Sequence, residues 1–124
     1  MQFIGNIDLT IFESEFGKLQ TNEVVLTDER EIHIKNNHPN DYPFFEKYAH
    51  DIITEPDIII CDNKNVGTVF MIKRLTDMNL NAVIRLVLES DEYGLKNSIM
   101  TFYRVRESNV QKLKAKNKII YSRE

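Results

Sequence analysis

Three side chains that can move protons or bind anions lie close together in the segment REIHIKNNHP (residues 30–39). They are Arg30, His33 and His38, and Pro39 follows them directly. Histidine titrates near neutral pH and serves as a general acid or base. A guanidinium binds phosphate oxygens through a fixed fork of donors. Three readings follow: acid–base chemistry on an anionic substrate, half of a metal site, or a basic helix end.

The spacing of the two histidines argues against a metal site. His33 and His38 are five residues apart, which places them roughly 140° apart around a helix of 3.6 residues per turn. The chain has no HExxH pattern, and Cys61 is its only cysteine. The usual zinc ligand sets are therefore missing, and the sequence predicts neither a metal nor another cofactor.

The two histidines differ in the structural work open to them. His38 directly precedes Pro39 and suits a helix C-terminus, where the helix dipole favours a cation and free carbonyls accept hydrogen bonds. His33 lies in mid-helix, with Arg30 three residues earlier on a similar face. A capping role is therefore available to His38, whereas His33 is the stronger candidate for proton transfer.

A further candidate, Arg85, interrupts the apolar run NAVIRLVLE. Arginine is almost never fully buried unless it is paired. Arg85 therefore forms a salt bridge with an acid such as Asp62, lies on a solvated face of the sheet, or binds a phosphate with its guanidinium. In the later run SIMTFYRVR, strand alternation puts Ile99, Thr101 and Tyr103 on one side and Arg104 on the other. If the two runs are neighbouring strands, two hydroxyl groups lie near Arg85.

The elements that must position these residues follow from periodicity. A helix is expected over 27–38, because Thr27 or Asp28 can cap it and Pro39 ends it. Apolar residues at helical spacing predict a second helix over 42–54. After Pro56 the period changes to short β-branched or aromatic runs joined by Asn-, Asp- and Gly-rich turns. These runs are DIIICD (57–62), TVFMIKRL (68–75), NAVIRLVLE (81–89) and SIMTFYRVR (98–106).

Short turns between successive strands require antiparallel pairing, since parallel strands need long crossovers. We therefore predict one α+β domain over residues 1–124, with N-terminal helices followed by a four-stranded antiparallel β-meander. A strand at 2–7 precedes the helices, and a short basic helix (108–117) and the segment KIIYS (118–122) end the chain. No run is long enough to cross a membrane, and the lone cysteine favours a reducing cytoplasm.

Charge is segregated along the chain. Residues 1–95 hold 8 Lys or Arg against 17 Asp or Glu, a net charge of −9, whereas residues 96–124 hold 8 against 2, a net charge of +6. The basic segment QKLKAKNK is either a solvated helix end or a local attractor of phosphates.

The order of these segments resembles that of a known nuclease group. The pattern LTDEREIHIKNNHP, IITEPDIIICDNKN, NAVIRLVLE, SIMTFYRV and KIIY is similar to the phage members of the Barnase–EndoU–Colicin–RelE superfamily, over residues 24–121. The resemblance implies a barnase- or RelE-like fold and a metal-independent ribonuclease, often a toxin of phages or mobile elements. It also implies RNA as the partner, together with an immunity or antitoxin protein.

The resemblance further implies which residues act. The expected catalytic residues are His33, His38, Arg85, Thr101 and Tyr103. The expected substrate-binding residues are Arg30, Lys73 and Arg104. The ribose 2′-hydroxyl would attack the neighbouring phosphorus and leave a 2′,3′-cyclic phosphate, with His33 in one proton-transfer role and His38 or Tyr103 in the other. The alternatives are a non-catalytic RNA- or protein-binding module of the same fold, and a phage structural or regulatory protein whose histidines only cap a helix.

Overall fold

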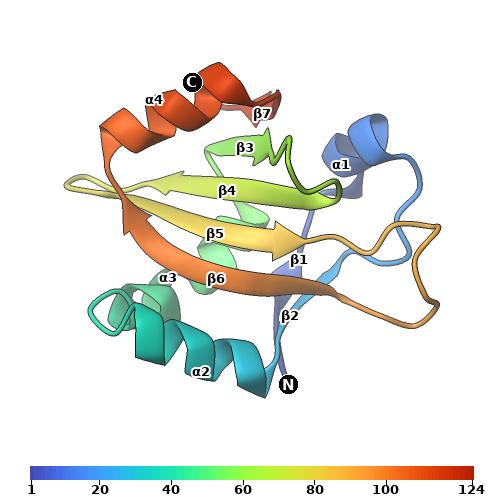
Figure 1. Ribbon diagram of the computed structural model, residues 1–124, viewed down its shortest axis with the longest axis horizontal. Coiled ribbons are helices and arrows are strands. Elements are labelled where there is room, and N and C mark those ends of the chain that lie inside the picture. The colour runs from blue at the N-terminus through green and yellow to red at the C-terminus, as the bar shows by residue number, and fades with distance from the viewer.

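Seven strands form one mixed sheet in the computed structural model, which describes residues 1–124 (Figure 1). Across the sheet the strands lie in the order β1-β2-β6-β5-β4-β3-β7. All neighbouring strands are antiparallel except β2 and β6, which run parallel. None of the four helices combines the length and the apolar character that crossing a membrane requires. In chain order, the elements are β1 (Gln2–Asn6), α1 (Leu9–Phe16), β2 (Glu23–Leu26), α2 (Asp28–Asn37), α3 (Tyr42–Thr54), β3 (Ile58–Cys61), β4 (Thr68–Arg74), β5 (Asn79–Arg85), β6 (Asn97–Val105), α4 (Glu107–Lys116) and β7 (Ile119–Ser122).

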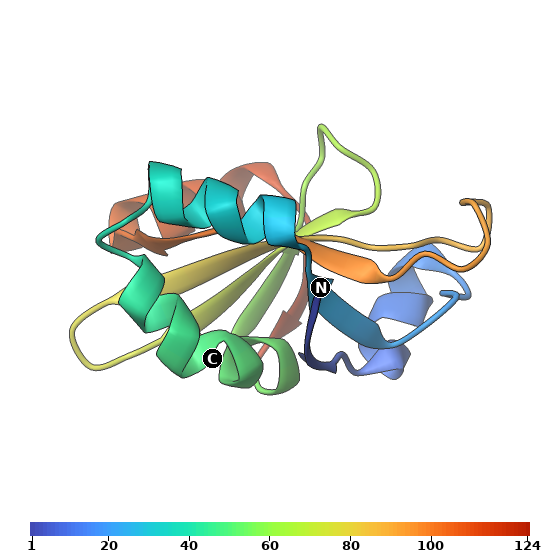
Figure 2. The same ribbon diagram turned by 90° about the horizontal axis from the view of Figure 1, so that it is seen from below.

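Helices α1 and α3 cover one side of the sheet, which we call the rear face (Figures 1 and 2). Helix α3 is amphipathic and turns its apolar side toward the strands. Within this core, the rings of Phe45 and Phe102 meet edge to face, with centroids 5.1 Å apart. The core also includes the buried strand residues Ile59, Val69, Met71, Leu80, Ala82 and Ile84.

Helices α2 and α4 lie on the opposite side, the front face, one along each flank of the central strands (Figure 2). Helix α4 buries Val110 and packs Leu113 against the front-facing residues Ile58, Ile60, Ile72 and Val105. Helix α2 lies along β6 and sends the fully buried Ile34 into the main core. The front of β4, β5 and β6 is therefore flanked by two helices but has no helix across its middle.

Helix α2 is fixed at both ends and against α3. The Thr27 hydroxyl accepts a hydrogen bond from the Arg30 backbone N–H (3.3 Å), and the backbone N–H of His38 donates to the Ile34 carbonyl (2.8 Å). The Tyr42 hydroxyl donates to the Glu31 carboxylate (3.1 Å). Burial, together with this bond to Glu31, raises the pKa of Tyr42 to about 12, so the phenol stays a donor between the two helices at neutral pH.

The expectation of N-terminal helices followed by a four-stranded antiparallel meander is wrong. The chain begins with strand β1, helix α1 and strand β2 before reaching α2 and α3, and the sheet has seven strands, one pair of them parallel. The physical reason is that both edges of the central strands find partners. On one edge β2 pairs with β6 and carries β1, and on the other β7 pairs with β3.

Arg74, at the end of β4, joins the sheet to α4 and to the last residue of the chain. Its guanidinium donates to the carboxylates of Glu107 and Glu124, and Asn79 also donates to Glu107 (3.0 Å). The pKa of Arg74 is raised by these hydrogen bonds. Hydrogen bonds from Gln111 and Arg74 lower the pKa of Glu107, and the bond from Arg74 lowers that of Glu124.

This cluster predicts a component of acid sensitivity. Carboxylates whose folded pKa is lowered stabilise the protein above their ordinary value of 4.5, and this contribution is lost as pH falls through the lowered values. We expect the melting temperature of the Glu107→Gln/Glu124→Gln variant to fall less steeply below pH 4.5 than that of the wild type.

The measurement is thermal unfolding across a pH series, with Asp77→Asn/Glu92→Gln as the control. Asp77 and Glu92 are exposed and their carboxylates form no ion pair, so this variant removes the same charge without touching the cluster. Parallel pH curves for the wild type and the Glu107/Glu124 variant would contradict the prediction.

Candidate functional site

Polar side chains occupy the middle of the front face, between α2 and α4. Alternate residues of a strand point to opposite faces. Since Leu80, Ala82 and Ile84 of β5 are in the rear core, the intervening residues of this strand face the front. The front-facing residues are Asn79, Asn81, Val83 and Arg85 of β5, together with Thr101 and Tyr103 of β6.

A β-bulge in β6 determines which of its side chains point to the front face. Thr101 pairs with Val83, but Ile99 pairs with the next residue of β5, Ile84, so one extra residue, Met100, stands between them. Ile99 is therefore buried in the rear core, and the strict alternation that placed it beside Thr101 is wrong. The bulge lets Ile99 enter the rear core while Thr101 and Tyr103 stay at the front.

Asn81 is the most deeply placed polar side chain of this face. It is fully buried, and its amide Nδ2 donates to the Tyr103 hydroxyl (3.0 Å). Its Oδ1 has no hydrogen-bond partner, and neither has the buried Oγ1 of Thr101. A buried polar atom without a partner costs about 1–3 kcal/mol, and such atoms call for an explanation such as a bound water or ligand.

His38 is the histidine that reaches β6. Its ring lies against that of Tyr103, with centroids 5.4 Å apart, and its Nδ1 lies 3.9 Å from the Asp41 carboxylate. As the C-cap of α2, His38 also has the structural role that its position before a proline predicts.

By helical spacing, Arg30 and His33 do not share the side of α2 on which Glu31 and Lys35 meet Tyr42 of α3. Asn37 donates from its amide nitrogen to Nδ1 of His33 (3.0 Å) and to the His33 carbonyl (3.1 Å). The Nε2 atom of His33 has no partner within the chain, nor has the guanidinium of Arg30. No hydrogen bond joins His33 to β6, so Arg30 and His33 are a pair of groups separate from His38 and Tyr103.

Arg85 is already paired. Its guanidinium donates to the Leu86 carbonyl and lies 3.5 Å from the Asp91 carboxylate. It also packs on Gly67, which has a positive φ of 89° and where any Cβ would collide with the guanidinium. The salt bridge proposed from the sequence therefore exists, with Asp91 rather than Asp62 as the acid. The side chain keeps 38% of its surface exposed.

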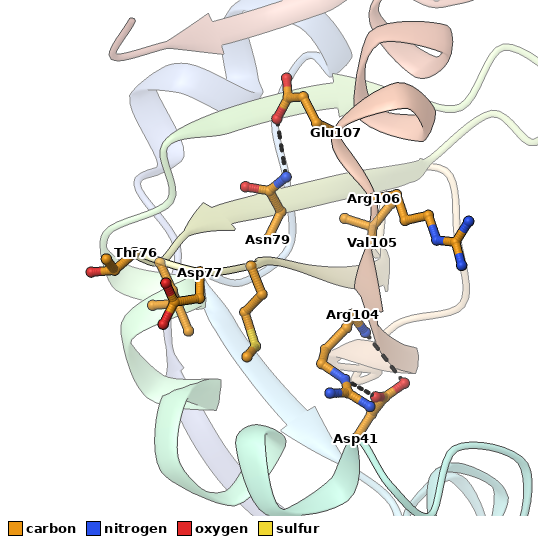
Figure 3. Close-up of a pocket in the computed structure, with 10 residues that line it drawn as sticks. Asp41, Thr76, Asp77, Asn79, Arg104, Val105, Arg106 and Glu107 are labelled. Atoms are coloured by element: carbon orange, nitrogen blue, oxygen red, sulfur yellow. Dashed lines mark hydrogen bonds and ion pairs between the residues drawn. The ribbon is translucent and has the colours of Figure 1, made fainter.

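Lys73 and Arg104 lie away from the front face. Lys73 donates from Nζ to the Glu55 carbonyl at the end of α3 (2.8 Å). Arg104 lies over the ring of Phe44 and forms an ion pair with Asp41. Figure 3 shows this pair in the largest hollow of the molecule, beyond the β4–β5 turn, where Asn79 likewise binds Glu107. Of the charged residues drawn there, Asp41 and Arg104 pair with each other, and Glu107 pairs with Arg74.

The structure therefore brings His38 to Tyr103, on the face that Thr101 shares. It shows no hydrogen bond or ion pair of Arg30 or His33 with β6. Lys73 lies elsewhere, and Arg104 is linked to His38 only through Asp41. Sequence reasoning missed Asn81. A signal was present, because Asn81 precedes Arg85 by four residues in the same apolar run and so shares its face. Asn81 is also the last residue of the segment TDMNLN (76–81), whose composition indicated a polar turn instead.

No three His, Cys, Asp or Glu side chains lie close enough together to hold a metal ion. Comparison of the chain with known protein families, with characterised proteins and with solved structures finds no significant match. The chemistry of the site must therefore be argued from its own side chains.

The two fully buried asparagines give a direct test of this site. Asn97 is saturated, accepting from the Val87 N–H (2.8 Å) and donating to the carbonyls of Thr21 (2.9 Å) and Glu23 (3.0 Å). Asn81 has one bond and one unpartnered oxygen. We expect Asn97→Leu to cost several kcal/mol, since each group left unpaired costs about 1–3 kcal/mol. Asn81→Leu should leave stability unchanged or raise it.

The measurement is urea unfolding of both variants against the wild type. A loss of stability in Asn81→Leu as large as that in Asn97→Leu would show that Asn81 is there for the fold.

Proposed function

We propose that this protein is a metal-independent endoribonuclease that cuts single-stranded RNA on the front face of its sheet. The proposal continues the resemblance of its segments to phage nucleases of the Barnase–EndoU–Colicin–RelE superfamily. Its main structural support is one feature: a tyrosine hydroxyl held by a buried asparagine, next to a histidine ring and an unpartnered threonine hydroxyl.

The cost of that arrangement supports a function for it. Asn81 and Thr101 bury polar atoms that nothing in the chain satisfies, and a protein selected only for stability would replace them with apolar residues. A phosphate oxygen cannot donate to the Asn81 carbonyl, but the hydroxyl groups of a ribose can. Thr101 can donate to a phosphate oxygen, so the two residues suit opposite parts of a nucleotide.

The proposed reaction uses groups of the front face together with His33 and Arg30 of α2. The ribose 2′ oxygen forms a bond to the adjacent phosphorus as the bond from phosphorus to the 5′ oxygen breaks. A base takes the 2′ proton, and an acid gives a proton to the departing 5′ oxygen. His33 transfers one of these protons through Nε2, and His38 or Tyr103 transfers the other. Arg30 and Arg85 stabilise the charge on the phosphorane oxygens.

A non-catalytic RNA-binding module is the second candidate, and the pairing of Arg85 favours it. The Asp91 carboxylate lies where a phosphate would bind the guanidinium, so Arg85 must exchange one anion for another during catalysis. In a binding module the same pair would be permanent. The two functions differ in whether the RNA is cut.

The proposal includes the cellular setting. RNA is the partner on the front face, the reaction takes place in the cytoplasm, and an immunity or antitoxin protein restrains the nuclease. The buried free thiol of Cys61 suits a reducing compartment.

The central prediction concerns His33. We expect His33→Ala to lower the rate of RNA cleavage by about 10² to 10⁴, the usual contribution of a positioned acid or base, with no change in melting temperature. His38→Ala should lower both the rate and the melting temperature, because His38 caps α2 and contacts Tyr103. The measurement is cleavage of a labelled single-stranded RNA, alongside thermal melts.

Asn36→Ala is the matched control, since Asn36 is an exposed residue of the same helix whose side chain makes no hydrogen bond. It should cut RNA at the wild-type rate. Full activity in His33→Ala would remove this residue from the mechanism, and an inactive wild type that still binds RNA would favour the binding module.

A further inference from the structure

A second hollow adjoins the proposed cleavage site on the side of α4. It has a volume of about 260 Å³ and lies between the last residues of β6 and the flank of the helix. Tyr103 belongs to both places, since it lines this hollow while its hydroxyl accepts a hydrogen bond from Asn81. The other lining residues are Val105, Asn109, Lys112, Leu113 and Lys116. A ligand group in this hollow would therefore touch the tyrosine of the site.

The lysines of the basic segment differ in whether a carboxylate lies near them. Lys114 lies 4.0 Å from the Glu124 carboxylate, and Lys118 lies 2.8 Å from that of Glu15. Lys112 and Lys116, the two that line the hollow, have no carboxylate partner. From the sequence, this segment was either a solvated helix end or an attractor of phosphates. In the structure it contains two lysines with a carboxylate partner and two without one.

The geometry of the two unpaired lysines suits a nucleic-acid strand. Residues four apart on a helix are neighbours, with Cβ atoms about 5–6 Å apart, so Lys112 and Lys116 can bind successive phosphates of one chain. Asn109, one turn before them, makes no side-chain hydrogen bond and offers both donors and an acceptor to a ribose or a base. No acidic residue lines the hollow.

We propose that this hollow is a subsite for single-stranded RNA, in which the strand runs from Tyr103 over α4 and Lys112 and Lys116 bind two phosphates next to the cut. The inference rests on the proposed function for its position in the reaction, but the subsite itself requires only binding. It gives the acidic protein a local positive track at the place where RNA must lie.

The test is the salt dependence of RNA binding. A fluorescent single-stranded 2′-O-methyl RNA, which lacks the attacking hydroxyl, is titrated with protein at several salt concentrations. Each phosphate contact on a single strand contributes about 0.7 to the slope of log K against log salt. Lys112→Gln/Lys116→Gln should therefore reduce the slope by about 1.4, a difference of about sevenfold in affinity over a fourfold rise in salt.

Lys114→Gln/Lys118→Gln is the matched control, because it removes the same charge from the same segment but takes the two paired lysines. Its slope should stay near that of the wild type. Equal slopes in the two double variants, or a wild type that does not bind the strand, would overturn the subsite.

The subsite and the proposed nuclease activity can fail independently of each other. Cleavage of unmodified RNA by the wild type with no effect of Lys112 and Lys116 on the slope would refute the subsite and leave the nuclease. The predicted change in slope without any cleavage would leave the subsite and refute the nuclease.

Discussion

The arrangement of the front face depends on one short parallel contact, held by a buried side chain. Only two residue pairs join β2 to β6, Val24 with Asn97 and Val25 with Ser98. Asn97 strengthens this contact with three hydrogen bonds, to the backbone of Thr21, Glu23 and Val87. Because β2 ends so soon, the chain turns into α2 beside the remainder of β6. A longer β2 would place a strand where the two histidines now lie.

The helices cover the two faces of the sheet unequally. The rear face is closed by α1 and α3, whereas α2 and α4 close only the flanks of the front (Figure 2). Asp41 binds strand β6 at this flank, since its carboxylate accepts hydrogen bonds from the backbone N–H of Arg104 (3.3 Å) and from the Arg104 guanidinium. The unpartnered atoms of Asn81 and Thr101 are buried, and they lie on the face that no helix crosses. This unsatisfied polarity beneath the uncovered face is the physical basis for placing function there.

Local signals predicted much of this chain, and the failures have physical causes. Capping by Thr27 and the apolar spacing of 42–54 indicated helices where α2 and α3 lie. Strand β2 escaped notice because four residues carry little periodicity and its parallel partner is 73 residues away in sequence. Alternation already separated Arg104 from Tyr103, so assigning both to one site contradicted the pattern. The bulge at Met100 and the choice of Asp91 as the partner of Arg85 depend on tertiary packing, which no local pattern contains.

The most direct test of the account uses a DNA strand that contains a single ribonucleotide, incubated with the protein in excess EDTA. Only one 2′-hydroxyl is then available to attack, and chelation removes any contribution from a divalent ion. The account predicts a single cut directly after the ribonucleotide, with a 2′,3′-cyclic phosphate identified on the product by mass spectrometry. Cleavage at deoxynucleotides, a product without the cyclic phosphate, or an intact strand under conditions in which the protein binds it would contradict the account.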